Sequence, residues 1–184
     1  MLPLTSCNIA ERNTQIMKHI KSIADLFVVQ LREQYSGERQ QLEAMPKLRA
    51  LTINEQVQQL LDVHIGRVRA QMERLDIVFE ILGRNVHGEV DHGIEGIIKE
   101  SLELAERCTD EMARDAGIIS SIQHMNHYNI ASYRTLTLVA GGLELKDILD
   151  LLSESFSEEQ ITDNELFVTA MDKIYLNGLS NHLK

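Results

Sequence analysis

The sequence predicts an all-α protein, built as a bundle of four long helices with one short extra helix. Apolar residues recur at steps of three and four through most of the chain, which is the spacing of one helix face. Only two prolines and ten glycines interrupt the 184 residues, too few for the many turns of a β-sandwich. A chain of this length is most simply one domain with a substantial core.

Capping and helix-breaking residues set the bounds of the first two helices. The helical pattern begins at Ser22, and Pro46 bends or stops the first helix because proline lacks a backbone N–H. Asn54 has the side chain of a good N-cap for the second helix. Gly83 ends that helix, because glycine tolerates the left-handed conformation of a helix end.

Three further helices follow with short connections. The short extra helix is expected over residues 94–107, and residues 109–111 (Thr-Asp-Glu) start the fourth helix. The fourth helix runs to the glycine pair 141–142, and the fifth continues from Leu145.

The domain organisation expected from these patterns is simple. We expect a loose N-terminal lead-in over 1–21, the helical bundle over 22–176 and a C-terminal tail over 177–184.

Charge and cysteine content exclude several classes of partner. The formal net charge of −10 repels phosphate backbones and anionic lipid, so neither nucleic acid nor a membrane is an expected partner. Cys7 and Cys108 have no metal-type spacing and suggest no disulfide scaffold. No apolar run reaches the length of a membrane helix, and the start resembles no secretory signal. We therefore expect a cytoplasmic protein.

Polar residues interrupt the apolar stripes of the four long helices. Eight such residues lie on or beside the stripes: Glu38, His64, Arg67, Gln71, Asn126, Asn129, Glu159 and Asp163. An unpaired buried carboxylate is costly, so these groups need a metal, an arginine, a proton or water. Ferritin-like metal sites meet that need with inward Glu and His side chains from four helices.

Four segments resemble the YciE/YciF family of bacterial ferritin-like stress proteins. They are YSGERQQLEAMPKL (35–48), HIGRVRAQMERLDIVFEILG (64–83), RDAGIISSIQHMNHYNIASYRTL (114–136) and SFSEEQITDNEL (155–166). The similarity covers roughly residues 22–175, and HYNIASYRTL is its most distinctive stretch. The resemblance implies a closed ferritin-like helical bundle, usually a dimer, with a di-metal site.

The resemblance also implies where that site lies, and the match there is partial. The family's first-helix glutamate falls on Glu38, and its second-helix His and Gln fall on His64 and Gln71. The acid pair of the last helix falls on Glu159 and Asp163.

Three acids of the family pattern are missing. Arg67 replaces one of them, and Asn126 and Asn129 replace the other two. Two divalent ions bring about four positive charges, which several carboxylates must offset. We therefore expect a polar network without metal, in which Arg67 pairs with the remaining carboxylates and the amides bridge the rest.

Other interpretations of these residues stay open. Glu38, His64, Glu159 and Asp163 together would suit one ion of iron, manganese or zinc. Alternatively, Arg67 lies on the solvated face with its neighbour Arg74, His64 is a structural histidine, and the last two acids are solvated. His124 and His127 lie off the fourth stripe and are expected to be exposed.

Three functions follow from these alternatives. The leading expectation is a non-enzymatic ferritin-like protein without cofactor, acting as a homodimer in a stress-related setting. The second is a metal-binding oxidoreductase that retains iron or manganese, and the third is an acidic module that binds an unknown protein partner. No catalytic residue is expected, because the chain lacks GxSxG, HExxH and phosphate-binding glycine motifs.

The homodimer has a residue-level argument as well. The second helix carries apolar residues outside its stripe, namely Val63, Ala70, Ile77 and Val78. Large exposed apolar patches usually mark interfaces.

Overall fold

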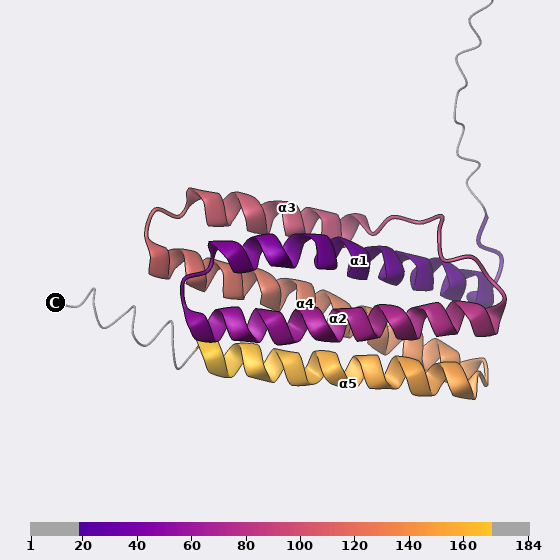
Figure 1. Cartoon of the computed structure of the whole chain (residues 1–184). Helices are drawn as coiled ribbons and strands as arrows, with labels where there is room; N and C mark the ends of the chain where they lie inside the picture. The colour runs from indigo at the N-terminus through magenta and orange to yellow at the C-terminus, as the bar shows by residue number, and fades with distance from the viewer. Residues whose placement is uncertain (1–18, 171–184) are drawn as a thin grey trace, which may run out of the picture.

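A computed structural model of the chain describes residues 19–170, which form five helices and no strand (Figure 1). The helices are α1 (Ile23–Leu51), α2 (Glu55–Leu82), α3 (His92–Arg107), α4 (Glu111–Gly142) and α5 (Lys146–Thr169). The predicted all-α, ferritin-like bundle with one short extra helix is confirmed. The expected tail over 177–184 and all but the last three residues of the expected lead-in lie outside the described residues.

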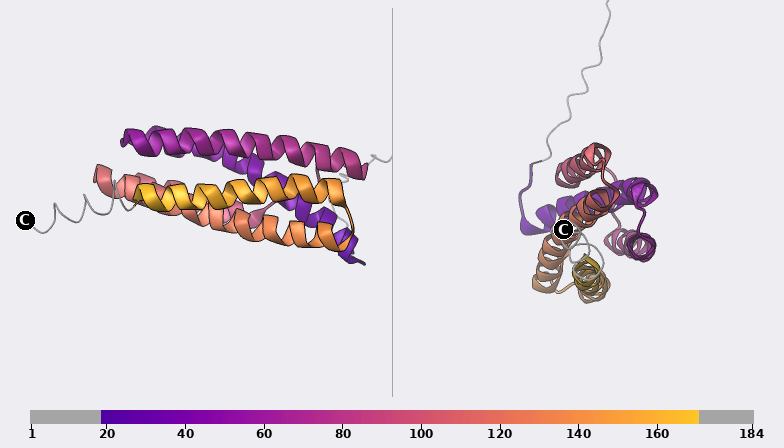
Figure 2. Two further views of the ribbon diagram at one scale, coloured as in Figure 1. Left: turned by 90° about the horizontal axis from the view of Figure 1, so that it is seen from below. Right: turned by 90° about the vertical axis from the view of Figure 1, so that its left-hand side faces the viewer.

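The four long helices form a closed ring around one interior. α1 packs on α2 and α4, and α5 packs on the other flanks of α2 and α4. The view along the bundle shows this arrangement, with α3 lying outside the ring (Figure 2). α3 covers the seam between α1 and α4, since it packs on both.

Local capping chemistry fixes the helix ends. The Ser22 hydroxyl accepts a hydrogen bond from the backbone N–H of Asp25, and the Asn54 side chain accepts from the first turn of α2. Gly83 ends α2 in the left-handed conformation, at φ 60°. Asp110 caps α4, as the acidic start of that helix suggested.

Pro46 does not stop α1, which continues to Leu51. Pro46 itself is exposed, whereas its neighbours Met45 and Leu48 are completely buried. Packing of these two side chains stabilises the last turns more than the lost backbone hydrogen bond weakens them. The short helix also begins two residues earlier than expected, at His92, because Asp91 caps it.

The apolar interior consists of two clusters, one toward each end of the bundle. One cluster is built around Met45, Leu48, Val57, Leu61, Ile118, Ile122 and Leu166. The other is built around Phe27, Leu31, Leu75, Phe79, Leu136, Ile148 and Leu152. On every long helix, the residues between the two clusters include buried polar side chains. The bundle therefore has a polar layer across its middle.

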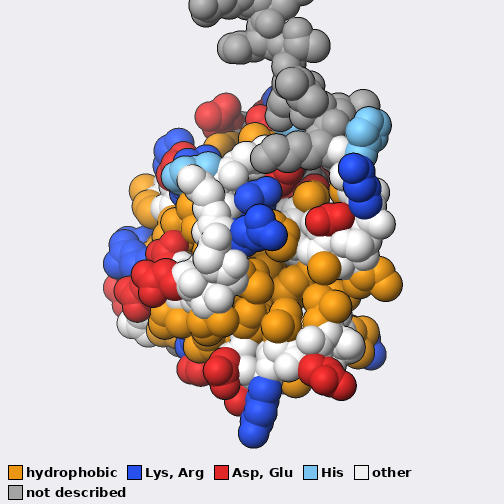
Figure 3. All heavy atoms as spheres, turned by 90° about the vertical axis from the view of Figure 1, so that its right-hand side faces the viewer, with side chains coloured by type: hydrophobic (Ala, Val, Ile, Leu, Met, Phe, Trp, Pro, Cys, Tyr) orange, Lys and Arg blue, Asp and Glu red, His pale blue; other side chains and the backbone are white. Residues whose placement is uncertain are grey.

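The outer surface keeps several apolar side chains. On α2, Val63, Ile77 and Ile81 are about half exposed, whereas Val78 is completely buried and cannot serve an interface. Hydrophobic side chains also gather at the end of the bundle where α1 begins (Figure 3). A groove of about 660 Å³ lies there, with Phe27, Leu82 and other residues in its lining.

No helix in residues 19–170 combines the length and the apolar character needed to cross a membrane.

Candidate functional site

The polar layer receives side chains from all four long helices. On α1, Gln34 and Gln41 lie four residues before and three residues after Glu38, so all three share the inner face. The members of the layer are at most 2% exposed: Gln34, Glu38, Gln41, Gln71, Asn126, Asn129, Ser155, Glu159 and Thr162. The layer is thus shielded from solvent by the apolar clusters on both sides.

Glu38 is the acidic member on α1. Its Oε1 accepts hydrogen bonds from the hydroxyl of Tyr133 at 2.8 Å and from Nε2 of Gln34 at 2.9 Å. Burial raises the pKa of Glu38 to about 8, and repulsion from Glu159 adds to the effect. Near pH 7 this carboxyl group is therefore mostly protonated.

Glu159 is the acidic member on α5. Nδ2 of Asn126 donates to its Oε2 at 2.6 Å and to its backbone oxygen at 3.0 Å. Burial raises the pKa of Glu159 to about 7, although the nearby amides of Gln71, Asn126 and Asn129 act in the opposite direction. Burial thus favours the protonated form of both carboxyl groups.

A pair of amides links α1 to α4 beside these carboxyl groups. Gln41 donates to Oδ1 of Asn129 at 3.2 Å, and Asn129 donates back to Oε1 of Gln41 at 3.1 Å. This reciprocal pair needs no charge and no ion, because each amide supplies both a donor and an acceptor.

Several buried atoms of the layer and its surroundings have no hydrogen-bond partner in the protein. They include Glu38 Oε2, Glu159 Oε1, Asn126 Oδ1 and both polar atoms of the Gln71 side chain. Buried polar atoms without a partner are costly, so they commonly mark water or ligand positions.

His64 lies nearby on α2 and is also buried, with both ring nitrogens unpartnered. Burial lowers the pKa of His64 to about 4, and the positive charge of Arg67 contributes. The imidazole is therefore neutral at pH 7.

Arg67 does not pair with Glu38, Glu159 or Asp163, contrary to our expectation. Its guanidinium binds Glu165 through two hydrogen bonds, at 2.6 and 3.0 Å, and donates to the hydroxyl of Thr162 at 2.8 Å. The reason is helical direction, because Arg67 points to the seam between α2 and α5 while the core acids point to the axis.

Arg74 lies on the same seam, about two turns further along α2. It binds both carboxylate oxygens of Glu158 at 2.8 and 2.6 Å, and Oε1 of Glu154 at 2.7 Å. The two arginines therefore clamp α2 to α5 at the edge of the polar layer. Arg67 donates to Thr162 and Arg74 to Ser155, but neither pairs with Glu38 or Glu159.

Asp163 also lies outside the layer. Its carboxylate is 35% exposed and makes a 3.0 Å contact with Nε2 of His127 on α4. Asp163 is one helical turn from Glu159, but it is rotated toward the surface. His124 and His127 are exposed, as the sequence predicts.

The donor set does not fit a di-metal centre. The layer contains two carboxyl groups, one from α1 and one from α5, whereas α2 and α4 contribute amides. Within residues 19–170 no three His, Cys, Asp or Glu side chains form a group that could hold a metal ion. The four candidates for a single ion, Glu38, His64, Glu159 and Asp163, therefore do not converge on one position.

Sequence reasoning missed the partners that hold the two carboxyl groups. Gln34 and Gln41 could have been found, because they share a helix face with Glu38. Tyr133 lies on the buried face of α4, but apolar spacing alone does not show that its hydroxyl meets Glu38. The pairing of Arg67 with Glu165 could not be predicted from the sequence, because it depends on how α2 packs on α5.

Comparisons with known proteins agree with this architecture. A family model described as "Domain of unknown function (DUF892)" matches residues 22–176. Protein YciF from Escherichia coli K12 is 34% identical over 157 residues, which cover 85% of this chain and 95% of YciF.

Solved structures show the same similarity. The crystal structure of the E. coli stress protein YciF matches with a TM-score of 0.80 at 34% identity, covering 83% of this chain and 97% of YciF. YcfI from Rhodopseudomonas palustris matches with a TM-score of 0.79 at 35% identity, covering 82% and 96%. A Xanthomonas campestris protein shares the fold at 16% identity, with a TM-score of 0.67 over 89% and 100% of the two chains.

Proposed function

We propose that this chain, which belongs to the DUF892 family and is similar to YciF, acts without catalysis through its bundle and its surfaces. In this proposal the core holds a proton-bearing polar layer where a ferritin-like enzyme would hold a pair of metal ions. The observation that carries the proposal is the pairing of each core carboxyl group with neutral donors, Tyr133 and Gln34 for Glu38 and Asn126 for Glu159.

The charge of the layer supports this reading of the core. Two divalent ions would need several carboxylates, whereas the layer supplies only Glu38 and Glu159, and burial favours their protonated forms when no ion is bound. The neutral donors Tyr133, Gln34 and Asn126 serve one oxygen of each carboxyl group, whereas Glu38 Oε2 and Glu159 Oε1, which could carry the protons, have no partner in the protein.

The setting of the protein is part of the proposal. The similar E. coli protein YciF is described as a stress protein, which supports a stress-related role, and we propose that this role is cytoplasmic. The half-exposed Val63, Ile77 and Ile81 on α2 support a homodimer that covers them. Light scattering at micromolar concentration should give the mass of two chains.

Metal analysis tests the central claim. Protein expressed with added iron or manganese should contain far less than one ion per chain, and a chelator should leave its melting temperature unchanged. A positive control is the double variant Asn126→Glu with Asn129→Glu, which adds two carboxylates to the layer and should gain metal-dependent stability.

One second candidate has a specific observation in its favour. His64 is buried, neutral and unpartnered at both ring nitrogens, which leaves it able to bind a metal ion. One iron or manganese ion per wild-type chain, lost in His64→Leu or Glu159→Gln, would overturn our proposal in favour of a metal-binding oxidoreductase.

A further inference from the structure

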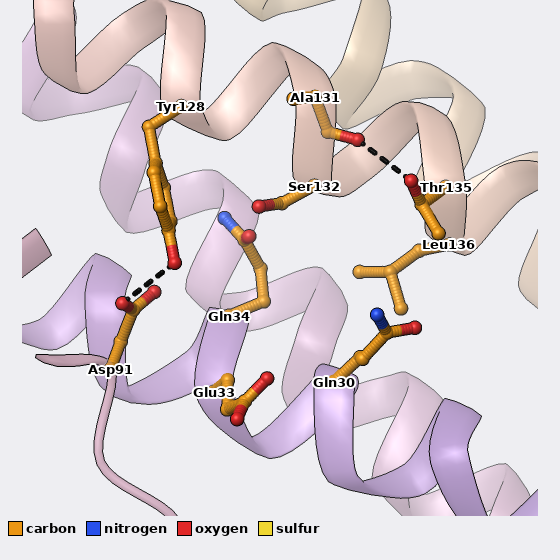
Figure 4. A pocket seen from close by; sticks show the side chains of 9 residues that line it. All are labelled: Gln30, Glu33, Gln34, Asp91, Tyr128, Ala131, Ser132, Thr135 and Leu136. Atoms are coloured by element: carbon orange, nitrogen blue, oxygen red, sulfur yellow. Dashed lines mark hydrogen bonds between the residues drawn. The ribbon is translucent and has the colours of Figure 1, made fainter. Parts of the chain in front are cut away.

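A pocket opens between α1 and α4, next to the polar layer. Its volume is about 240 Å³, and Figure 4 shows side chains from both helices around it. Its nine lining residues include Gln30, Glu33 and Gln34 of α1 and Tyr128 and Leu136 of α4. Asp91, just before α3, closes one side.

The walls of the pocket are held firmly where α3 begins. The hydroxyl of Tyr128 donates to Oδ1 of Asp91 at 2.9 Å, and the backbone N–H of Ile94 donates to the same oxygen at 3.0 Å. Gly93 lies directly against the Tyr128 ring, so that an added Cβ would come within 2.7 Å of it. The Asp91 carboxylate is therefore held in place, and the residue is only 4% exposed.

The hydrogen-bonding groups of the pocket are unbalanced. The Tyr128 hydroxyl is engaged by Asp91, the Thr135 hydroxyl by the backbone oxygen of Ala131, and Nε2 of Gln34 by Glu38. In contrast, Oε1 of Gln34 and Oε1 of Gln30 are buried and have no partner. The pocket thus offers two buried acceptors without a partner, while three of its donors are already engaged.

The charge of the lining residues also favours a ligand that donates hydrogen bonds. Two of the nine lining residues are acidic, and none is Lys or Arg. Burial raises the pKa of Glu33, and repulsion from Asp91 and Glu89 contributes, so acidic side chains gather at this pocket. A positively charged ligand would relieve this repulsion.

We propose that this pocket binds a small aliphatic ammonium ion. Its N–H groups would donate to Glu33 and, after a small movement of the two amide side chains, to the unpartnered oxygens of Gln34 and Gln30. Its alkyl chain would lie against Ala131, Leu136 and the ring of Tyr128, which supply the apolar part of the lining. A second observation, besides the acidic groups, also points to a ligand. Oε1 of Gln34 has no hydrogen-bond partner, although the residue is only 2% exposed.

A bare metal ion fits the pocket less well. Hard cations need about six to eight oxygen ligands at roughly 2.0–2.6 Å, with several carboxylates among them. Here two carboxylates border a space far larger than one ion, and one Asp91 oxygen already accepts two hydrogen bonds. An ammonium group donates hydrogen bonds at longer distances than a metal ion needs for its ligands, and its carbon chain would fill the remaining volume.

Gln34 joins this pocket to the core. Its nitrogen binds Glu38 while its oxygen is free on the other side of the amide. Binding in the pocket is therefore one side chain away from the polar layer, although it does not depend on whether that layer holds metal.

Titration with butylamine tests the proposal directly. Calorimetry or amide NMR should show saturable binding in the millimolar range, with shifts confined to the residues around the pocket. Butanol, which has the same chain length without the charge, should bind at least about tenfold more weakly, as expected for loss of a charged hydrogen bond. Potassium and magnesium chloride at equal ionic strength should not produce the same shifts.

Two variants with one control make the result decisive. Glu33→Gln should weaken butylamine binding about tenfold, and Ser132→Leu should block it by filling the pocket without a change of charge. Glu43→Gln, an exposed change on the same helix, should leave binding within about twofold. Absence of saturable binding, equal binding of butanol, or full binding by folded Glu33→Gln would each overturn the proposal.

Discussion

Tyr133 on α4 donates a 2.8 Å hydrogen bond to Glu38 on α1, and both side chains are completely buried. The phenol keeps its proton, because burial and the neighbouring Glu38 raise the pKa of Tyr133 well above its ordinary value. The bond therefore has a fixed direction, with Tyr133 as donor. It ties the first helix to the fourth through a carboxyl group whose own protonation changes near neutral pH.

Stability should fall as the pH rises from about 6.5 to 8.5. The pKa values of Glu38 and Glu159 are raised to about 8 and about 7, so the folded state binds protons that the unfolded chain has already released. Their stabilisation is complete below the unfolded pKa and is lost as pH passes the folded values. A fall in Tm of a few degrees or more should appear in thermal melts, at about 2–4 °C per kcal/mol.

The control for this effect is a pair of isosteric variants. Glu38→Gln and Glu159→Gln should flatten the profile above pH 6.5, because Gln does not titrate. Below pH 6.5 His64 acts in the opposite sense, since its lowered pKa of about 4 makes protonation destabilise the fold. A wild-type profile that rises between pH 6.5 and 8.5 would contradict the assignment of protonated core acids.

Tyr133→Phe should destabilise the protein by about 1–3 kcal/mol, measured by urea denaturation at pH 7. The change removes one of the two donors to Glu38 Oε1 and leaves that atom under-satisfied in the core. In a Glu38→Leu background the same change should cost much less, since its partner is gone. Equal costs in the two backgrounds would show that the hydroxyl contributes nothing through Glu38.

Arg67 and Glu165 should show a coupling energy of roughly 1 kcal/mol or less in a double-mutant cycle of Arg67→Met and Glu165→Gln. The two side chains are 21% and 37% exposed, so water screens the pair and the loss of either partner is tolerated. Arg74 and Glu158, at 13% and 23% exposure, should couple more strongly. A coupling of about 3 kcal/mol or more for Arg67 would place it in the core, where it would neutralise a buried acid.

Gly93→Ala should destabilise the protein by about 1–2 kcal/mol in urea denaturation, because the added Cβ must displace Tyr128 from its bond with Asp91. Gly96→Ala on the same helix meets nothing within 4 Å and should instead stabilise by about 0.5–1 kcal/mol. Similar values for the two variants would mean that the start of α3 adapts freely to Tyr128.

Much of this molecule was predictable from local chemistry. The spacing of apolar residues gave five helices, and Asn54, Gly83 and Asp110 marked their ends through capping bonds that form within one turn. Glu38, Asn126, Asn129 and Glu159 were placed in the core by their position on apolar stripes, because burial follows helix periodicity. The resemblance to YciE/YciF proteins, confirmed by the comparisons, rested on the same segments.

The sequence by itself therefore determined which residues enter helices and which polar residues sit on their apolar faces. Only the tertiary structure decided which partner each polar group meets. Arg67 binds Glu165 and Asp163 meets His127, because a rotation of a few tens of degrees about the helix axis moves a side chain from the core to a seam. Such rotations are set by how four helices pack together, a property of segments far apart in the sequence that no single helical pattern contains.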